Sequence, residues 1–247
     1  MNEPLLSVRG LTKRCGGVHA LEDVGFDLAT GEVLALAGDN GAGKSTLIKS
    51  ICGVHQPNAG EIRFCGAHVA FENPRAARDA GIETIHQDLA LADNLDVGAN
   101  VFLGREPMRR ILGILPALDR NRMAAEARRA VSTLDIAIPR LDLPVRALSG
   151  GQRQAVAIGR ALLWNAKVLI MDEPTAALGV PEQRKVLALV NSLKAAGKSV
   201  IFISHNLADI FAVADRILVL HRGRKAGERT IVETSADEVV RLMVGTG

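Results

Sequence analysis

The sequence predicts an α/β protein that combines a parallel sheet, an antiparallel β piece and a helical subdomain. A fully apolar run at residues 33–37 leads through a glycine-rich loop into a helix start. Residues 167–247 alternate short apolar runs with helical patterns, and the segment before them is helical in character. With 247 residues, of which 48% are hydrophobic and 23% charged, the chain has the composition of an ordinary folded protein.

The N-terminal part of the chain is predicted to be rich in strands. Residues 5–36 alternate short apolar segments with turns such as 30–32, which predicts an antiparallel β piece before the glycine-rich loop. The elements expected next, in chain order, are a helix from Lys44 to near Gly53, a turn at 56–60, and strands at 61–65 and 82–86.

Residues 88–160 differ in character and predict a helical subdomain. Between residues 119 and 134, apolar side chains recur at helical spacing with arginines between them; they are Met123, Ala127, Ala130, Val131 and Leu134. Prolines divide the segment into separate elements at Pro107, Pro116, Pro139 and Pro144. We therefore expect a single domain over residues 1–247, in which 1–87 and 161–247 form the core with its β subdomain and 88–160 form the helical subdomain.

The C-terminal part predicts the strands and helices of a parallel sheet. Short apolar strands are expected at 168–171, 200–203 and 217–220. A helix is expected at 181–196, because Pro181 lies near its start and Gly197 just past its end. A last helix is expected after Ser235, since Ser235 and Glu238 have the spacing of a capping box.

Charge and cysteine content narrow the class of protein. The chain has 30 basic and 27 acidic residues, one tryptophan and no tyrosine, so nucleic acid is not expected as a partner. The three cysteines, Cys15, Cys52 and Cys65, are widely spaced and indicate free thiols in a reducing compartment. The N-terminus lacks the pattern of a secretion signal, and no apolar run approaches the roughly 20 residues that cross a bilayer. We expect a cytoplasmic protein.

The glycine-rich loop at residues 38–46 is the first candidate site. Such a loop at a helix N-terminus directs backbone N–H groups and the helix dipole at one anion. Lys44 is suited to the β- and γ-phosphates of a triphosphate, and the Ser45 hydroxyl is suited to Mg²⁺. A chance glycine turn is the alternative, but the preceding strand and the following helix favour a phosphate loop. The binding residues expected here are Gly38, Asp39, Asn40, Gly41, Ala42, Gly43, Lys44, Ser45 and Thr46.

Two carboxylates at the end of the strand at 168–171 form the second candidate site. Asp172 is suited to hold Mg²⁺ through its water shell, and Glu173 to activate the attacking water as the catalytic base. The alternative is a strand that simply ends in solvated acids. Together with the phosphate loop, the pair favours the chemical role.

A second glycine-rich turn, at residues 148–152, precedes a helical pattern at 153–163 and is a second candidate anion site. One triphosphate has no evident need for both turns of the same molecule. Two chains that face each other, each closing the nucleotide of the other, would explain the presence of both.

In combination these motifs resemble the ATP-binding subunit of an ABC transporter, and the resemblance runs essentially end to end. It implies a P-loop NTPase (RecA-like) ABC ATPase core in which Ser149, Gly151 and Gln152 bind the nucleotide of the opposite subunit. It identifies Gln87 as a residue that associates with magnesium and catalysis and links the nucleotide to the membrane partner. It identifies His205 as the switch residue that senses the γ-phosphate.

The chain departs from this family at two positions. Cys15 stands where an aromatic side chain usually stacks on adenine, and a thiol has less surface and no π-face. We therefore expect Cys15 to give weaker or less selective base binding. Gly179 stands where many members carry an aspartate that helps to couple the two sites of the dimer.

The amino-acid sequences of the motifs at 38–45, 171–180 and 204–206 are most similar to those of bacterial monosaccharide importers, particularly single-cassette fructose importer ATPases. This implies a homodimer with transmembrane permease subunits at the cytoplasmic face of the inner membrane, and indirectly an extracytoplasmic sugar-binding protein. Another cargo, or export, stays open. A soluble ATPase that acts on nucleic acid is the less favoured alternative, because the chain has no long coiled-coil insertion or second cassette.

The permease is expected to dock near residues 87–105. The apolar side chains of this segment are Leu89, Leu91, Leu95, Val97, Val101, Phe102 and Leu103. About half of them are expected to pack in the subdomain core instead.

Overall fold

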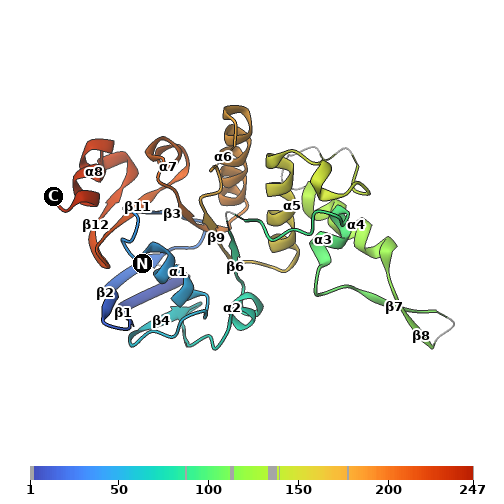
Figure 1. The fold of residues 1–247 in the computed structure, drawn as a ribbon, viewed down its shortest axis with the longest axis horizontal. Helices are drawn as coiled ribbons and strands as arrows, with labels where there is room; N and C mark the ends of the chain where they lie inside the picture. Colours follow the sequence, from blue (N-terminus) through green and yellow to red (C-terminus); the bar gives the residue numbers. More distant parts are fainter. Residues whose placement is uncertain are drawn as a thin grey trace.

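The computed structural model describes residues 3–86, 88–111, 114–132, 138, 140–176 and 178–246. Figure 1 shows a core that contains the sheets and the C-terminal helices, with further helices and a hairpin extending to one side. Gln87, one of the predicted site residues, lies outside the described residues.

A six-stranded sheet forms the centre of the core, in the order β12-β11-β3-β10-β9-β6. All neighbours are parallel except β11 and β12, which pair antiparallel. The strands are β3 (Val33–Ala37), β6 (Ile82–Ile85), β9 (Val168–Asp172), β10 (Ser199–Ile203), β11 (Arg216–His221) and β12 (Arg224–Thr230). Every residue of β3 and β10 is buried, as expected for strands covered on both faces. The predicted α/β class is confirmed.

Two hydrophobic cores lie on opposite faces of this sheet. Leu36 of β3 belongs to a core with Leu47 of α1 (Lys44–Ile51), whereas its neighbour Ala35 belongs to the other core. That second core holds Leu189 and Ile210 together with side chains of four helices. These helices are α5 (Gly150–Leu163), α6 (Val180–Ala195), α7 (Leu207–Val213) and α8 (Ala236–Val244). The alternation of strand side chains therefore decides which layer each residue joins.

The predicted antiparallel β piece is a separate four-stranded sheet, in the order β2-β1-β4-β5. Its strands are β1 (Leu6–Cys15), β2 (Val18–Leu28), β4 (Ala59–Phe64) and β5 (Ala67–Val69). It is followed by α2 (Pro74–Ala80). Asn73 caps the start of this helix, because its side chain accepts a hydrogen bond from the Ala76 N–H at 3.0 Å.

The described residues of the segment expected to be helical form three helices and also a hairpin that the sequence analysis missed. The helices are α3 (Val97–Phe102), α4 (Arg120–Ser132) and α5, and a 3₁₀ turn (Val145–Ala147) precedes α5. They share a core with Val97, Val101 and Phe102, so these three of the seven expected docking side chains are buried. The hairpin pairs β7 (Met108–Ile111) with β8 (Leu115–Leu118). Helix α5 runs past residue 160, where the boundary was expected, and also packs against α6.

The chain ends with the turn Ile231–Glu233 and α8. The Ser235 side chain caps α8 by accepting a hydrogen bond from the Glu238 N–H at 3.3 Å. The Glu238 carboxylate does not complete the expected box, because it accepts hydrogen bonds from Arg229 at 2.7 Å and Thr234 at 2.8 Å. Across the described ranges, no helix has the length and apolar character needed to span a membrane.

Candidate active site

The strand order brings three candidate segments to one edge of the central sheet. Strand β10 lies between β3 and β9, and Ile203 is level with Leu36 on one side and Asp172 on the other. Because these strands are parallel, their carboxyl ends meet at the same edge. The phosphate loop follows β3, Glu173 follows β9, and His205 follows β10 two residues after Ile203.

The phosphate loop wraps closely because of its glycines. Gly38, Gly41 and Gly43 have φ values of 146°, 81° and 106°, which L-residues with side chains rarely adopt. A Cβ on Gly43 would lie 2.8 Å from the Ala20 carbonyl oxygen, whereas one on Gly41 would meet nothing within 4 Å. The loop is thus packed against β2 at Gly43 and open at Gly41.

Lys44 holds the loop in its present shape. Its ammonium group donates a hydrogen bond to the Gly38 carbonyl and another, at 3.1 Å, to the Asp39 carbonyl. Ser45 is exposed and no side chain caps α1, so the N-terminal turn of the helix faces the loop. This arrangement places a cation, a hydroxyl and a helix N-terminus together.

The β11–β12 turn braces the loop, a contact that the sequence analysis missed. The Gly223 N–H donates to the Ala42 carbonyl at 2.9 Å, and the Gly223 carbonyl accepts from the Glu22 N–H at 2.8 Å. Gly223 has φ 79°, and a Cβ there would lie 2.9 Å from the Ala20 carbonyl oxygen. The turn therefore ties the phosphate loop to β2.

Asp172 is half-buried at the end of β9. Burial raises the pKa of its carboxyl above the ordinary value, opposed by electrostatic interaction with His86 and by the positive charges of Lys44 and Lys49, while the charge of Glu173 adds to the rise. Removing a charged carboxylate from water costs free energy, and a cation bound beside it at the phosphate loop would offset that cost.

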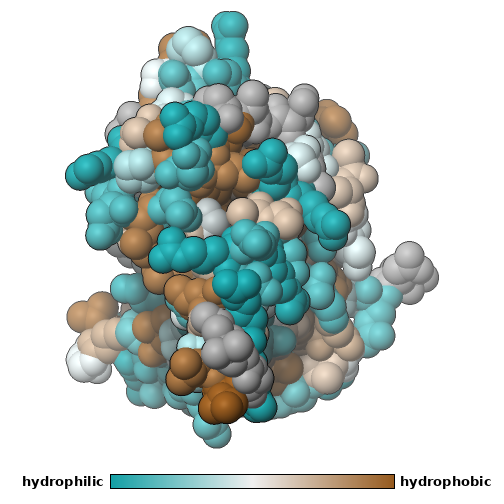
Figure 2. All heavy atoms as spheres, turned by 90° about the vertical axis from the view of Figure 1, so that its right-hand side faces the viewer, coloured by the Kyte–Doolittle hydropathy of each residue, from teal (hydrophilic) through white to brown (hydrophobic). Residues whose placement is uncertain are grey.

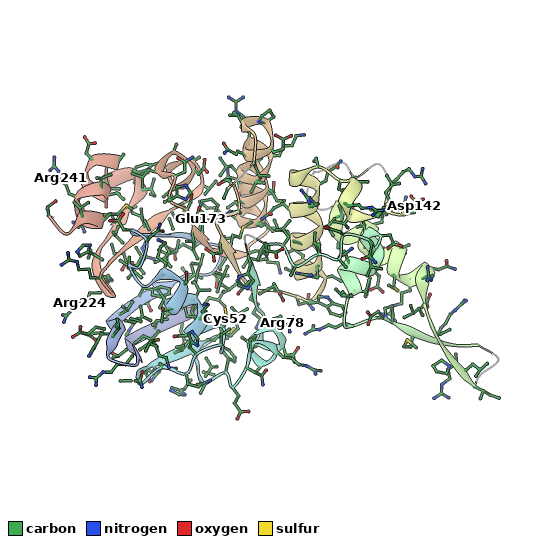
Figure 3. All side chains as sticks on the ribbon, in the orientation of Figure 1. Cys52, Arg78, Asp142, Glu173, Arg224 and Arg241 are labelled. Atoms are coloured by element: carbon green, nitrogen blue, oxygen red, sulfur yellow. The ribbon has the colours of Figure 1, made fainter. Side chains whose placement is uncertain are left out.

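Glu173 is held in place at both its backbone and its side chain. It adopts φ 52°, in the left-handed region, and its N–H donates to the Ile203 carbonyl at 3.0 Å. His205 Nδ1 lies 2.8 Å from Glu173 Oε2, with the carboxylate 19% exposed and the imidazole 73% exposed. Figure 3 places Glu173 near the middle of the molecule, close to β9 and α6. The structure therefore brings these two predicted residues together.

The segment after Glu173 is anchored to α7 by a buried contact. The Thr175 hydroxyl donates to Asp209 Oδ2 at 2.7 Å, and both side chains are buried. Since the two residues are 34 positions apart, no local sequence pattern could have indicated this contact.

The second glycine-rich turn begins α5. The Ser149 hydroxyl accepts a hydrogen bond from the Gln152 N–H at 3.4 Å, and the Gln152 side chain accepts from the Ser149 N–H at 3.0 Å. This is a capping box, in which Ser149 is exposed and Gly151 is buried. Gly150, Gln154 and Leu178 line a cavity of about 240 Å³ together with Glu173. A Cβ on Gly150 would come within 2.6 Å of Leu178.

The structure also shows the surroundings of Cys15 and of the segment that follows residue 87. Cys15 is exposed at the end of β1 and pairs with Val18, which is also exposed. The segment after residue 87 is held by Arg160 of α5, which donates to the carbonyls of Leu89 at 3.4 Å and Ala90 at 3.2 Å. Burial lowers the pKa of Arg160.

Comparisons with known proteins agree on one family. The family model of the ABC transporter matches residues 21–176. A xylose/arabinose import ATP-binding protein of Sulfolobus acidocaldarius is 47% identical over 97% of this chain and 93% of its own. A fructose import ATP-binding protein of Rhizobium meliloti is 46% identical over 98% and 95%. A ribose import ATP-binding protein of Burkholderia cenocepacia is 44% identical over 98% of this chain, which spans 47% of that protein.

Solved structures with a similar fold are ATP-binding cassettes of ABC transporters. A nucleotide-free cassette superposes with a TM-score of 0.82 at 26% identity and covers 97% of this chain and 98% of its own. A cassette in the ADP conformation gives a TM-score of 0.81 at 26% identity and covers 99% and 100%.

Proposed function

Because the chain belongs to the ABC transporter family and is an ATPase coupled to sugar import, we propose that it powers the uptake of fructose or a similar monosaccharide through separate permease subunits. The observation that carries the catalytic part is the convergence of the phosphate loop, Asp172 and the Glu173–His205 pair at one sheet edge. The sugar is proposed from the relatives, whose names specify xylose/arabinose, fructose and ribose.

The phosphate loop would bind the triphosphate of ATP. The residues that would line it are Gly38, Asp39, Asn40, Gly41, Ala42, Gly43, Lys44, Ser45 and Thr46. Lys44 would exchange its bonds to the Gly38 and Asp39 carbonyls for bonds to phosphate oxygens, which are stronger because they are charge-assisted. Cys15 would lie on the base side and offer little surface for stacking.

Ser45 and Asp172 fit a magnesium ion that accompanies ATP. Mg²⁺ prefers oxygen ligands and keeps several waters, so a hydroxyl and one carboxylate suffice beside the phosphates. The ion would supply charge neutralisation at the phosphates. Gln87 remains part of this proposal on the basis of its position in the sequence.

Glu173 would act as the general base. Its carboxylate is mostly buried, which reduces competition from bulk water, and His205 donates a hydrogen bond that fixes its orientation. The His205 imidazole is 73% exposed, and in this proposal it would turn from Glu173 toward a γ-phosphate. Hydrolysis would therefore require His205 to change partners.

A second copy of the chain would complete the site, since Ser149, Gly151 and Gln152 lie at the start of a different helix from the one that the phosphate loop begins. The permease subunits and, indirectly, an extracytoplasmic sugar-binding protein complete the proposed importer, with this chain at the cytoplasmic face of the inner membrane. A cargo other than a monosaccharide is the alternative. The relatives do not favour a nucleic-acid role.

Uptake of labelled monosaccharides tests the proposal. Cells that carry the wild-type chain, Lys44→Ala or the control Lys185→Ala, an exposed lysine on α6, are compared for fructose, ribose, xylose and arabinose. Loss of uptake of one sugar in Lys44→Ala alone supports the importer role and identifies the cargo. Unchanged uptake of every sugar in Lys44→Ala would contradict the sugar assignment.

A further inference from the structure

The end of the molecule that carries α3, α4 and the β7–β8 hairpin presents a mixed surface. Figure 2, which faces this end, shows hydrophilic and hydrophobic residues interleaved across it. The described part of that face therefore indicates no single kind of ligand. Two nucleophilic side chains in the part of the molecule that holds the sheets, Cys65 and Lys167, indicate a definite chemistry.

The thiol of Cys65 and the amine of Lys167 are in contact. Lys167 Nζ lies 3.3 Å from Cys65 Sγ and donates a hydrogen bond to it, although the two residues are 102 positions apart. Both residues are exposed. Cys15 is exposed as well, but its sulfur has no hydrogen bond in the part of the chain that the structure describes. Cys65 therefore differs from Cys15 in having a nucleophilic nitrogen within reach of its sulfur.

The backbone around Cys65 is fixed by a tight turn. Phe64 pairs with Ala67, so β4 and β5 are joined by the two-residue loop Cys65–Gly66. Both loop residues lie in the left-handed region, with φ values of 52° and 80°, as this kind of hairpin loop requires. The Cys65 N–H also donates to the Leu5 carbonyl at 2.8 Å. The thiol is thus held at the end of a hairpin of the antiparallel sheet.

Lys167 is fixed on the central sheet, one residue before β9. Its N–H donates to the Gly81 carbonyl at 2.8 Å, and its carbonyl accepts from the Ser199 N–H at 3.1 Å. Its Nζ lies 5.8 Å from the centre of the Phe64 ring, and Phe64 is buried at the end of β4. These contacts bring an amine from one sheet to a thiol of the other.

We propose that this pair is a redox modification site, at which hydrogen peroxide converts the thiol and the amine into a sulfenamide. The Cys65 sulfur attacks the peroxide, whose O–O bond breaks; the sulfur is oxidised to a sulfenic acid and one water is released. The neutral Lys167 amine then attacks that sulfur. The N–S bond forms, the S–O bond breaks, and the hydroxyl leaves as a second water with a proton from the amine.

The geometry favours this bond over further oxidation of the sulfur. Reacting atoms about 3–3.5 Å apart are in a near-attack arrangement, which gives a neighbouring group a large advantage over a reagent from solution. Lys167 Nζ is at such a distance from Cys65 Sγ. The bond would join the β4–β5 hairpin to the residue before β9 and would stabilise the fold, because it closes a long loop of the unfolded chain.

Mass spectrometry of the purified full chain, before and after hydrogen peroxide, tests the proposal. The wild type is expected to lose the mass of two hydrogen atoms, and its proteolytic fragments should show Cys65 joined to Lys167. A thiol reductant should restore the original mass. After removal of the peroxide, the linked protein should have a thermal midpoint about 5 °C or more above that of the untreated protein.

Matched variants separate the bond from general oxidation. Lys167→Arg keeps a positive charge but replaces the amine by a guanidinium that stays protonated, so the linked fraction should fall about tenfold or more. Lys185→Arg changes an exposed lysine of α6 and should link as the wild type does. Cys65→Ser removes the sulfur, so peroxide should not raise its thermal midpoint. This variant also reports any effect of oxidised methionines.

A Cys65 that stays a free thiol in peroxide, or that forms a sulfinic acid without a link to Lys167, would overturn the proposal. An equal loss of two hydrogen atoms in Lys167→Arg would also overturn it, because the sulfur would then have another partner. A linked protein with an unchanged midpoint would contradict the tie between the two sheets. The test involves neither sugar nor ATP, so its outcome is independent of the proposed function.

Discussion

At the scale of single residues, the Glu173–His205 contact makes the clearest prediction. Glu173→Gln keeps the shape of the side chain and an acceptor oxygen, but an amide cannot take a proton from water. The turnover number for ATP should fall by about 10²–10⁴-fold, the usual contribution of a general base, while ATP affinity is retained. Phosphate release and nucleotide binding, measured separately, check this. Hydrolysis by Glu173→Gln at the wild-type rate would assign the base to another group.

Glu83 of β6 gives a prediction about pH. Burial raises the pKa of its carboxyl, opposed by the charges of Arg78, Arg160 and Arg105. A raised folded-state pKa means that the charged form lowers the stability above that pKa, and that this cost disappears as the pH falls below the ordinary pKa of the carboxyl, 4.5. Glu83→Gln should therefore raise the thermal midpoint at pH 8, by about 2 °C, and leave it unchanged near pH 4. Calorimetry of this variant and the exposed-residue control Glu72→Gln, at both pH values, distinguishes this cause from a general effect of charge.

At the scale of elements, the β11–β12 turn determines the position of the phosphate loop. Gly223→Ala would place a Cβ 2.9 Å from the Ala20 carbonyl oxygen at φ 79°. The matched control is Gly197→Ala, which has φ 75° but nothing within 4 Å of its Cβ. Backbone strain should lower the free energy of unfolding of both variants by about 1 kcal/mol. Only Gly223→Ala should be destabilised further by the close contact. It should also bind ATP more weakly, because it shifts the N–H that donates to the Ala42 carbonyl. Equal midpoints and equal ATP affinities would show that the turn does not brace the loop.

The helices and strands could be predicted from the sequence more fully than the contacts between distant residues could. The apolar runs at 168–171, 200–203 and 217–220 became β9, β10 and β11 because continuous apolar segments suit strands covered on both faces. Strand β12 was missed because Arg224–Thr230 is polar and becomes a strand only by pairing with β11. The β7–β8 hairpin was missed because its Pro116 and short strands resemble a helix linker. The contacts of Gly223 with Ala42 and of Thr175 with Asp209 depend on strand order, which no local pattern encodes.

At the scale of the whole molecule, the two glycine-rich turns belong to different parts of the chain. The phosphate loop begins α1 on one side of the central sheet, whereas the Ser149 turn begins α5, which packs on the other side and against the helices of the middle segment. Ser149 is exposed although it caps its helix, so its hydroxyl can contact a second molecule. This geometry favours a site shared between two copies.

ATP-dependent dimerisation tests that arrangement, with cap stability separated from phosphate contact. Aspartate is as good an N-cap as serine, so Ser149→Asp should keep α5 stable while its carboxylate repels the γ-phosphate of the facing copy. Ser149→Ala should lower stability by about 1 kcal/mol through the lost cap. In a Glu173→Gln background, size-exclusion chromatography with ATP should show a dimer when Ser149 is unchanged and monomers when Ser149→Asp is added. An ATP-dependent dimer that survives Ser149→Asp would mean that the turn does not face the partner's nucleotide, because a carboxylate beside a triphosphate could not be accommodated there without cost.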